Sequence, residues 1–126
     1  MKSALWVGVL VASVLFSVPL VRSQENLRAL QPEDFPRPQR PAVAFAHDAH
    51  NEKARIESCN ECHHVYADGQ RVPDESSEGQ RCSDCHGLQD AGRLPGLMKA
   101  FHLNCKGCHQ KHHKGPVMCG ECHARR

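Results

Sequence analysis

Few stretches of the chain have apolar and polar residues placed with a clear helical or strand period. An uncharged, mostly apolar run extends from Ala4 to Val21, behind a short basic start. The alternation over Ala42–Phe45 predicts a short strand, and the next residues, His47–His50, are expected to form a helical turn. We therefore expect little regular structure in this part of the chain.

Two further elements are predicted downstream. The polar segment Val65–Arg81 contains the turn pair Asp68-Gly69, which predicts a hairpin followed by a surface loop. Leu94–Leu103 is the best helix candidate, because Pro95 lies near its start and four apolar side chains share one face, Leu94, Leu97, Met98 and Phe101. These elements indicate one small domain.

Apolar side chains are too few to build an ordinary core. From Gln24 to Arg126 only 14 residues are Leu, Ile, Val or Phe, a fraction that resembles a disordered chain. Small domains of this kind are held together by something other than side chains, such as bound metals. We expect the polypeptide to wrap around a cofactor and not to fold without it.

A pentapeptide of the pattern C-x-x-C-H occurs four times and contains every cysteine of the chain. It is the attachment pattern of a c-type haem. On one turn of helix two thiols and an imidazole share a face, so the thiols bond to vinyl groups at the porphyrin edge and the imidazole binds iron. Four covalent haems are therefore predicted, and we number them first to fourth in motif order. Their attachment cysteines are Cys59 and Cys62, Cys82 and Cys85, Cys105 and Cys108, and Cys119 and Cys122. Their iron ligands from the motifs are His63, His86, His109 and His123.

Paired cysteines have two other common uses, in zinc ribbons and in disulfides. A zinc ribbon leaves the four adjacent histidines unexplained, and a disulfide scaffold leaves all ten histidines unexplained. The haem interpretation accounts for both residue types and is favoured.

The N-terminus predicts export. Residues 1–23 have the basic start, apolar stretch and small-residue end of a secretory signal, cleaved after Ser23. The alternative is an uncleaved membrane anchor, which Pro19 and Gly8 disfavour. Either segment takes the cysteines out of the cytoplasm, and a bacterial periplasm is the simplest location.

The rest of the chain divides into two parts. Residues 24–41 carry four prolines and predict an extended arm, and residues 42–126 are expected to form the domain.

Six histidines lie outside the motifs, and four irons need four further ligands if each is closed by a second imidazole. His64 follows a motif histidine and points about 100° away from it, so it is expected to reach a neighbouring haem. His47 and His50 are three residues apart and share a helical face. His102 lies on the predicted helix before the third motif. These four histidines are the candidate second ligands.

Other side chains compete for these positions. His112 and His113 belong to a basic segment, residues 111–114, which is expected to be an exposed loop, although either ring is able to replace His102. A methionine ligand would raise the potential of its haem. Met98 is expected to pack on a haem face. Met118 lies too close to Cys119 to bend back onto the iron of that motif.

The pattern V-A-F-x-H-x-x-H at Val43–His50 comes first, and C-x-x-C-H-H at Cys59–His64 follows. Three further haem motifs come next, with a single His102 between the second and third of the four motifs. In the order of its motifs the chain resembles the tetrahaem cytochromes c3 of sulfate-respiring bacteria. The resemblance implies a small, mainly α fold with little regular structure, organised around four c-type haems and carrying a short N-terminal β-hairpin. It also implies bis-histidine ligation, with these pairs on the first to fourth haems: His47 and His63, His64 and His86, His50 and His109, His102 and His123.

Within that family the chain most resembles the type II, or acidic, cytochrome c3 that serves a transmembrane redox complex. Type I members commonly have a longer spacer, C-x-x-x-x-C-H, at two sites, and Val65–Arg81 is long for the type I pattern. A sequence pI of about 8.2 fits the acidic label poorly. Loss of the signal leaves 14 basic and 14 acidic residues, and ionised haem propionates would then make the loaded protein acidic.

Charge is divided along the chain. Residues 48–90 carry ten acidic and four basic side chains, and residues 91–126 carry seven basic side chains against Glu121. Such a dipole is able to steer a redox partner.

A haem closed on both sides by imidazole has no open position for a substrate, so a low-potential electron carrier is expected, not an enzyme. The resemblance implies that electrons arrive from hydrogenase or a type I cytochrome c3 and pass to a membrane-bound redox complex. Membrane association would come through that partner, with no nucleic acid and no small-molecule substrate. The alternative is a multihaem reductase in which one five-coordinate haem acts on a small anion or a metal oxyanion.

Overall fold

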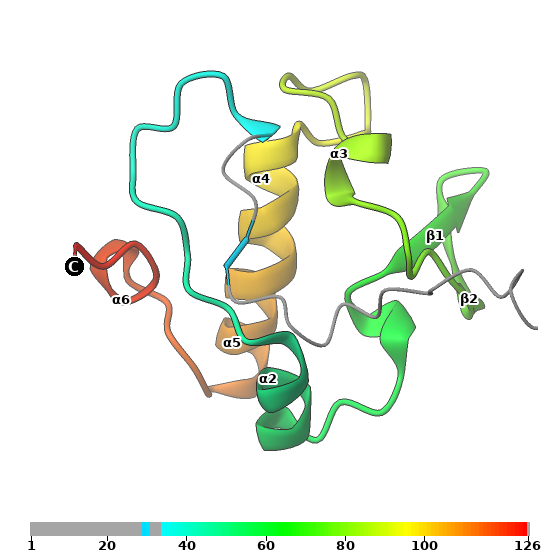
Figure 1. Cartoon of the computed structure of the whole chain (residues 1–126). Helices are drawn as coiled ribbons and strands as arrows, with labels where there is room; N and C mark the ends of the chain where they lie inside the picture. Colours follow the sequence, from blue (N-terminus) through cyan, green and yellow to red (C-terminus); the bar gives the residue numbers. More distant parts are fainter. Residues whose placement is uncertain (1–28, 31–33, 126) are drawn as a thin grey trace, which may run out of the picture.

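A computed structural model describes residues 29–30 and 34–125. Short helices and one hairpin are joined by long irregular segments (Figure 1). The predicted signal, residues 1–23, lies outside the described residues. The elements in chain order are α2 (His47–Ala54), a 3-10 turn (Cys59–Glu61), β1 (His64–Ala67), β2 (Gln70–Ser76), α3 (Cys82–Cys85), α4 (Leu97–Phe101), a π-helical segment (His102–Lys106), α5 (Gly107–His112) and α6 (Cys119–Cys122).

The predicted hairpin is confirmed. β1 and β2 pair antiparallel, with Val65 opposite Val72, and the register becomes irregular next to His64. Asp68 and Gly69 form the turn and have φ angles of 51° and 77°. Two consecutive positive φ values suit the tight turns that match the twist of a two-stranded ribbon, and Asp-Gly is a preferred pair there.

The predicted strand Ala42–Phe45 is wrong. Ala44 makes a single antiparallel bridge with Ala29, supported by a hydrogen bond from the Leu30 amide to the Val43 carbonyl of 3.0 Å. The preceding segment is rich in proline, which lacks an amide donor, and α2 begins directly afterwards, so little chain remains for a ladder. The N-terminal hairpin implied by the resemblance is therefore only this bridge in the described residues, and the molecule's hairpin is β1–β2.

The predicted helix Leu94–Leu103 exists but has other ends. It begins at Leu97, with Gly96 as N-cap, because Pro95 and the bridge between Ala91 and Leu94 keep the preceding loop out of the helix. At its far end α4 passes without a break through the π-helical segment into α5 and stops at His112 (Figure 1, yellow to orange). The third motif therefore lies inside the longest helical column of residues 34–125.

Side chains alone build almost no core. Leu97 is 1% exposed and is the only buried hydrophobic residue in the part of the chain that the structure describes. Two other members of the predicted apolar face are exposed, Leu94 and Met98, at 42% and 61%. The sparse apolar composition predicts this outcome.

The N-terminal arm contacts the domain at further described points beside the Ala29–Ala44 bridge. Asp34 forms an ion pair with Arg81, next to α3, and the ring of Phe35 lies 6.4 Å from that of Phe101 on α4. The described residues contain no helix long and apolar enough to cross a bilayer.

Candidate functional site

Each C-x-x-C-H motif occupies one helical turn. The amide of the motif histidine donates to the carbonyl of the first cysteine four residues earlier, at 2.9 Å for His63, 2.8 Å for His86 and 2.9 Å for His123. The first motif begins in the 3-10 turn, the second and fourth form α3 and α6, and the third spans the π-helical segment and α5. Residues three and four apart on such a turn share a side, so two thiols and one imidazole face the same way in each motif.

An acidic residue before the second cysteine caps two of these short helices. The carboxylate of Asp84 accepts a hydrogen bond from the Arg81 amide at 2.8 Å. That of Glu121 accepts from the amides of Met118 and Val117 at 2.8 and 3.0 Å, and these bonds lower the Glu121 pKa. Gly107 holds the same position in the third motif, where the helix is continuous and has no free N-terminus to cap.

Eight imidazoles meet in four pairs. The centres of the paired rings are 6.3 Å apart for His47 and His63, 6.0 Å for His64 and His86, 6.2 Å for His50 and His109, and 6.4 Å for His102 and His123. Each pair joins one motif histidine to one candidate second ligand. The pairs are the same four that the family resemblance implies.

This spacing fits one metal ion between two rings. An imidazole nitrogen binds a transition metal at about 2.0–2.1 Å and lies about 1.1 Å from its ring centre, so two rings on opposite sides of one ion have centres about 6.3 Å apart. Direct ring stacking would bring the centres closer. The distance between ring centres is thus compatible with one ion in every pair.

Proline carbonyls fix the orientation of three motif histidines. The Nδ1–H groups donate to the carbonyl oxygens of proline residues at 2.8, 2.7 and 2.8 Å, in the pairs His86 with Pro95, His109 with Pro116, and His123 with Pro41. A hydrogen bond at one ring nitrogen fixes the tautomer and leaves the other nitrogen free to bind a metal. Nε2 is therefore the nitrogen that is left free to bind a metal in these three rings.

Burial favours the neutral form of two adjacent histidines, His63 and His64. The pKa of His63 is lowered by burial and then by the nearby His47. The pKa of His64 is lowered by burial and then by His86. Metal ligands must be deprotonated, so a lowered pKa assists binding.

The eight cysteines are free thiols. Seven of them are exposed, yet surrounding protein raises the pKa of the Cys105 thiol to about 11, chiefly by desolvation and then through the neighbouring Cys62. In the described residues, no three or more side chains of His, Cys, Asp or Glu are grouped as a metal-binding cluster.

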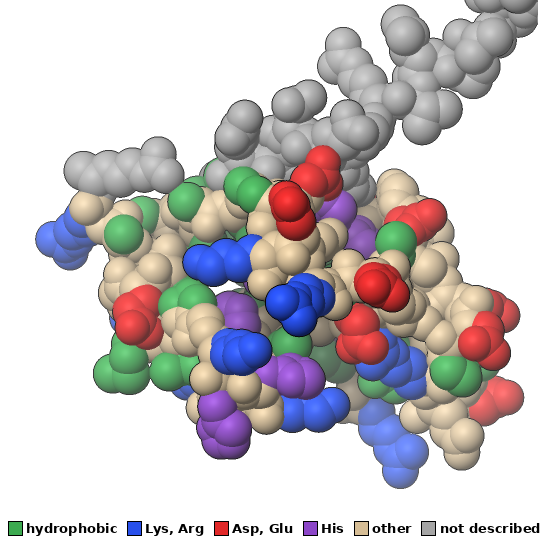
Figure 2. All heavy atoms as spheres, turned by 90° about the horizontal axis from the view of Figure 1, so that it is seen from below, with side chains coloured by type: hydrophobic (Ala, Val, Ile, Leu, Met, Phe, Trp, Pro, Cys, Tyr) green, Lys and Arg blue, Asp and Glu red, His purple; other side chains and the backbone are tan. Residues whose placement is uncertain are grey.

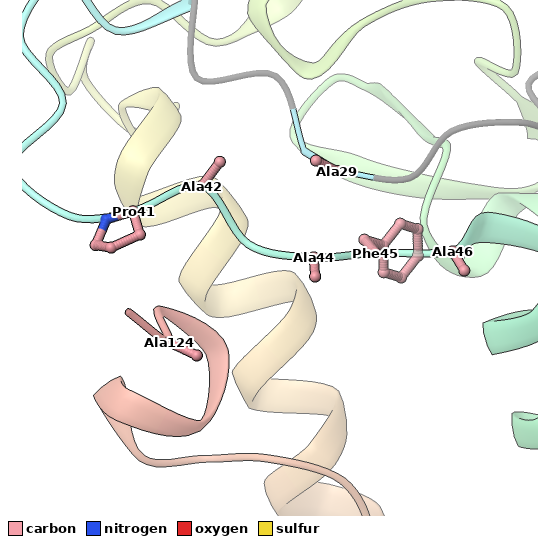
Figure 3. Close-up of a pocket in the computed structure, with 7 residues that line it drawn as sticks. All are labelled: Ala29, Pro41, Ala42, Ala44, Phe45, Ala46 and Ala124. Atoms are coloured by element: carbon pink, nitrogen blue, oxygen red, sulfur yellow. The ribbon is translucent and has the colours of Figure 1, made fainter. Parts of the chain in front are cut away.

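An apolar hollow lies beside the fourth pair. Its volume is about 720 Å³, and apolar side chains line it from Ala29, from the Pro41–Ala46 segment and from Ala124, which follows His123 (Figure 3). Pro41 is also the residue whose carbonyl holds His123. Cofactor sites of this size are apolar with a few placed polar groups, so the hollow suits a flat apolar group such as a porphyrin.

The remaining candidates lie outside the four pairs. His112 and His113 are exposed, as expected, but His112 ends α5 and His113 caps it, so the predicted loop is wrong for the first of them. The two candidate methionines, Met98 and Met118, are 61% and 66% exposed.

Sequence reasoning missed the residues that support the imidazoles. The three prolines carried no motif of their own, and only the positions of Pro95 and Pro116, nine and seven residues after a motif histidine, were a signal. Phe45 also escaped notice as a contact, although its ring centre lies 4.9 Å from that of His50. Tyr66 packs edge-on against His64 at 5.4 Å.

Comparison with known proteins gives a family and three relatives. The model of the class III cytochrome c family matches residues 24–123. A cytochrome c3 from Desulfovibrio desulfuricans is 32% identical over 91 residues, which are 66% of this chain and 78% of that protein. A cytochrome c7 from Geobacter metallireducens is 42% identical over 45 residues, 35% of this chain and 49% of that protein.

The third relative is a high-molecular-weight cytochrome c from Nitratidesulfovibrio vulgaris, 32% identical over 83 residues. That match covers 61% of this chain and 14% of the relative. The chain thus spans less than two thirds of two of these three relatives and more than two thirds of the third.

Proposed function

We propose that this chain, which belongs to the class III cytochrome c family, is a periplasmic, low-potential tetrahaem electron carrier. Members of that family bind c-type haems and carry electrons. The observation that supports this proposal most is the set of four imidazole pairs, each with its ring centres 6.0–6.4 Å apart. Every pair includes a histidine that follows two free thiols on the same helical turn.

Each residue type has one role in this proposal. The eight cysteines would hold the haems covalently, and each motif histidine would supply one iron ligand. His47, His64, His50 and His102 would supply the second ligand of the first to fourth irons. The proline carbonyls keep Nε2 of three motif histidines directed at the metal.

Two imidazoles on each iron leave no position for a substrate. A haem ligated in this way supplies reversible one-electron oxidation and reduction, and imidazole ligands without methionine favour a low potential. The chain's own residues fix the distances between the sites, because His63 and His64 are adjacent in sequence and His102 and His109 lie on one helical column. Such fixed spacing suits an electron relay.

The proposed partners are redox proteins. All four motifs are C-x-x-C-H and the β1–β2 hairpin lengthens the segment between the first two motifs, which favours a type II cytochrome c3. Electrons would come from hydrogenase or a type I cytochrome c3 and pass to a transmembrane redox complex. Export by the N-terminal signal would place the protein in the periplasm.

Charge on the surface supports docking at one face. Lys and Arg side chains gather around exposed histidines in Figure 2, and Asp and Glu side chains are spread over the left, the top and the right of that face. Four exposed lysines follow the start of α4: Lys99, Lys106, Lys111 and Lys114. We call these four lysines the positive face and propose them as the contact for an acidic partner.

Carbon monoxide binding to the reduced protein tests the carrier function. Bis-histidine iron has no free position, so the visible spectrum should stay unchanged under carbon monoxide. A spectral change in one of the four haems would reveal a five-coordinate iron and favour the reductase alternative. A colourless protein from a host with haem-attachment machinery would rule out both.

A further inference from the structure

Gly115 lies directly against the face of the His109 imidazole. A Cβ atom at Gly115 would be 2.7 Å from Cδ2, 2.9 Å from Nε2 and 3.0 Å from Cγ of His109. Carbon atoms in contact are normally about 3.5–4.0 Å apart, so any side chain here would collide with the ring. Nε2 is the atom that the proposed function assigns to the third iron.

We propose that Gly115 is a positioning residue that sets the orientation and the iron bond of the His109 imidazole. This inference rests on the proposed function, in which His109 and His50 bind the third iron. The glycine does not touch the iron itself. It lets the backbone support one face of the ring, where every other residue would displace it.

The chain turns back on His109 immediately after α5. His113, the C-cap, has a φ of 51°, and the Lys114 amide donates to the His109 carbonyl at 3.1 Å. Gly115 follows with a φ of 83°, a value that glycine adopts without strain. The next residue, Pro116, accepts the hydrogen bond from His109 Nδ1 at 2.7 Å. Two consecutive residues therefore support the ring face and fix the tautomer.

Other glycines with positive φ lack such a contact. Gly79 has a φ of 87° and Gly92 a φ of 61°, and a Cβ at either position would meet nothing within 4 Å. The left-handed conformation is therefore shared, but the close approach to an imidazole is found at Gly115. This difference separates the backbone effect of a substitution from its effect on the ring.

A methyl group at residue 115 should tilt or shift the His109 ring. The shift would lengthen the bond between Nε2 and iron and strain the hydrogen bond to the Pro116 carbonyl. Both changes reduce electron donation to ferric iron, so the midpoint potential of the third haem should rise. The other three sites should be unaffected because their imidazoles do not contact Gly115.

The experiment compares the loaded Gly115→Ala protein with Gly79→Ala and Gly92→Ala, which carry the same backbone strain. Haem content is measured by intact mass, ligand geometry by electron paramagnetic resonance of the oxidised protein, and potentials by redox titration. His50→Ala identifies the signal of the third haem, which becomes high-spin. Gly115→Ala should shift that low-spin signal and raise one potential, while both controls match the wild type.

Gly115→Asn guards against poor folding of the alanine variant. Asparagine tolerates positive φ and still carries a Cβ atom, so it should shift the same signal. If Gly115→Ala or, where that variant does not accumulate, Gly115→Asn matches the wild type, the inference is overturned while the proposed function stands. Fewer than four low-spin haems in the wild type would instead contradict the proposed function.

Discussion

The Nδ1 atom of His123 lies 2.8 Å from the carbonyl oxygen of Pro41, although 82 positions separate the two residues in the sequence. The contact ties the last motif to the residue that ends the N-terminal arm. It also fixes the tautomer of His123, as the carbonyls of Pro95 and Pro116 do for His86 and His109.

These hydrogen bonds should protect three ring protons. In the reduced, diamagnetic protein labelled with ¹⁵N-histidine, the Nδ1–H protons of His86, His109 and His123 should exchange slowly with solvent. Ring protons of His112 and His113, which are exposed, serve as the internal control and should exchange fast. Equal exchange rates for both groups would contradict the hydrogen bonds.

Replacing a second ligand should affect one haem only. His47→Ala, His50→Ala, His64→Ala and His102→Ala should each convert one of four low-spin haems to high-spin, because each removes one imidazole from a different pair. The measurement is the absorption and paramagnetic resonance spectrum of the oxidised protein.

Two exposed histidines provide the matched control. His112→Ala and His113→Ala should leave the spectrum unchanged, since neither ring belongs to a pair. A high-spin signal from His112→Ala, with none from His102→Ala, would show that the ligand of the fourth iron is assigned incorrectly.

The cap of α6 should make stability depend on pH. Folding lowers the pKa of Glu121 through its hydrogen bonds to the Met118 and Val117 amides. The charged carboxylate therefore stabilises the folded protein above the ordinary carboxyl pKa, and this contribution is lost as the pH falls through the lowered value.

Glu121→Gln tests that cap in thermal unfolding across a pH series. The variant should be less stable than the wild type at neutral pH, and the difference should shrink in acid. Glu75→Gln, a change at an exposed strand residue, is the control. A difference that stays constant down to low pH would mean that the carboxylate charge is not what stabilises α6.

Local chemistry made the hairpin and the motif turns predictable. Asp68-Gly69 favours a tight turn wherever it occurs, and C-x-x-C-H needs one helical turn to bring its ligands together. Ends of elements were harder to predict because they depend on neighbours. The helix that starts at Leu97 continues into α5 through a π-helical segment, for which the sequence has no marker.

Contacts between residues far apart in the sequence limited how much of the site could be predicted. The motif cysteines and histidines follow from spacing alone, whereas the partner of each imidazole came from family resemblance. The structure brings those same pairs together, and iron binding by them stays a prediction. The Pro41 carbonyl is a backbone atom far along the chain, so no side-chain pattern pointed to it.

Partner association should depend on the positive face. Reversal to glutamate at Lys106, Lys111 or Lys114 should slow electron exchange with an acidic redox partner. The effect of Lys99→Glu should be smaller, because the Lys99 ammonium already lies 2.8 Å from the Asp90 carboxylate. Salt should slow the reaction too, as the screening length falls from about 10 Å at 0.1 M to about 3 Å at 1 M.

Stopped-flow mixing with reduced hydrogenase or donor cytochrome measures these rates. Reversal at the acidic residues Asp74, Glu75 and Glu78, all exposed, is the matched control and should matter less. A rate that ignores salt and the lysine reversals, or that responds only to the acidic residues, would move the docking site to the hairpin side.

This chain is expected to hold four covalent haems, and the intact mass of the mature protein gives their number. Protein produced in a host with haem-attachment machinery should have the mass of residues 24–126 plus four haem groups, and that mass should survive acid extraction of non-covalent haem. A mass gain of three haems or fewer would contradict the account.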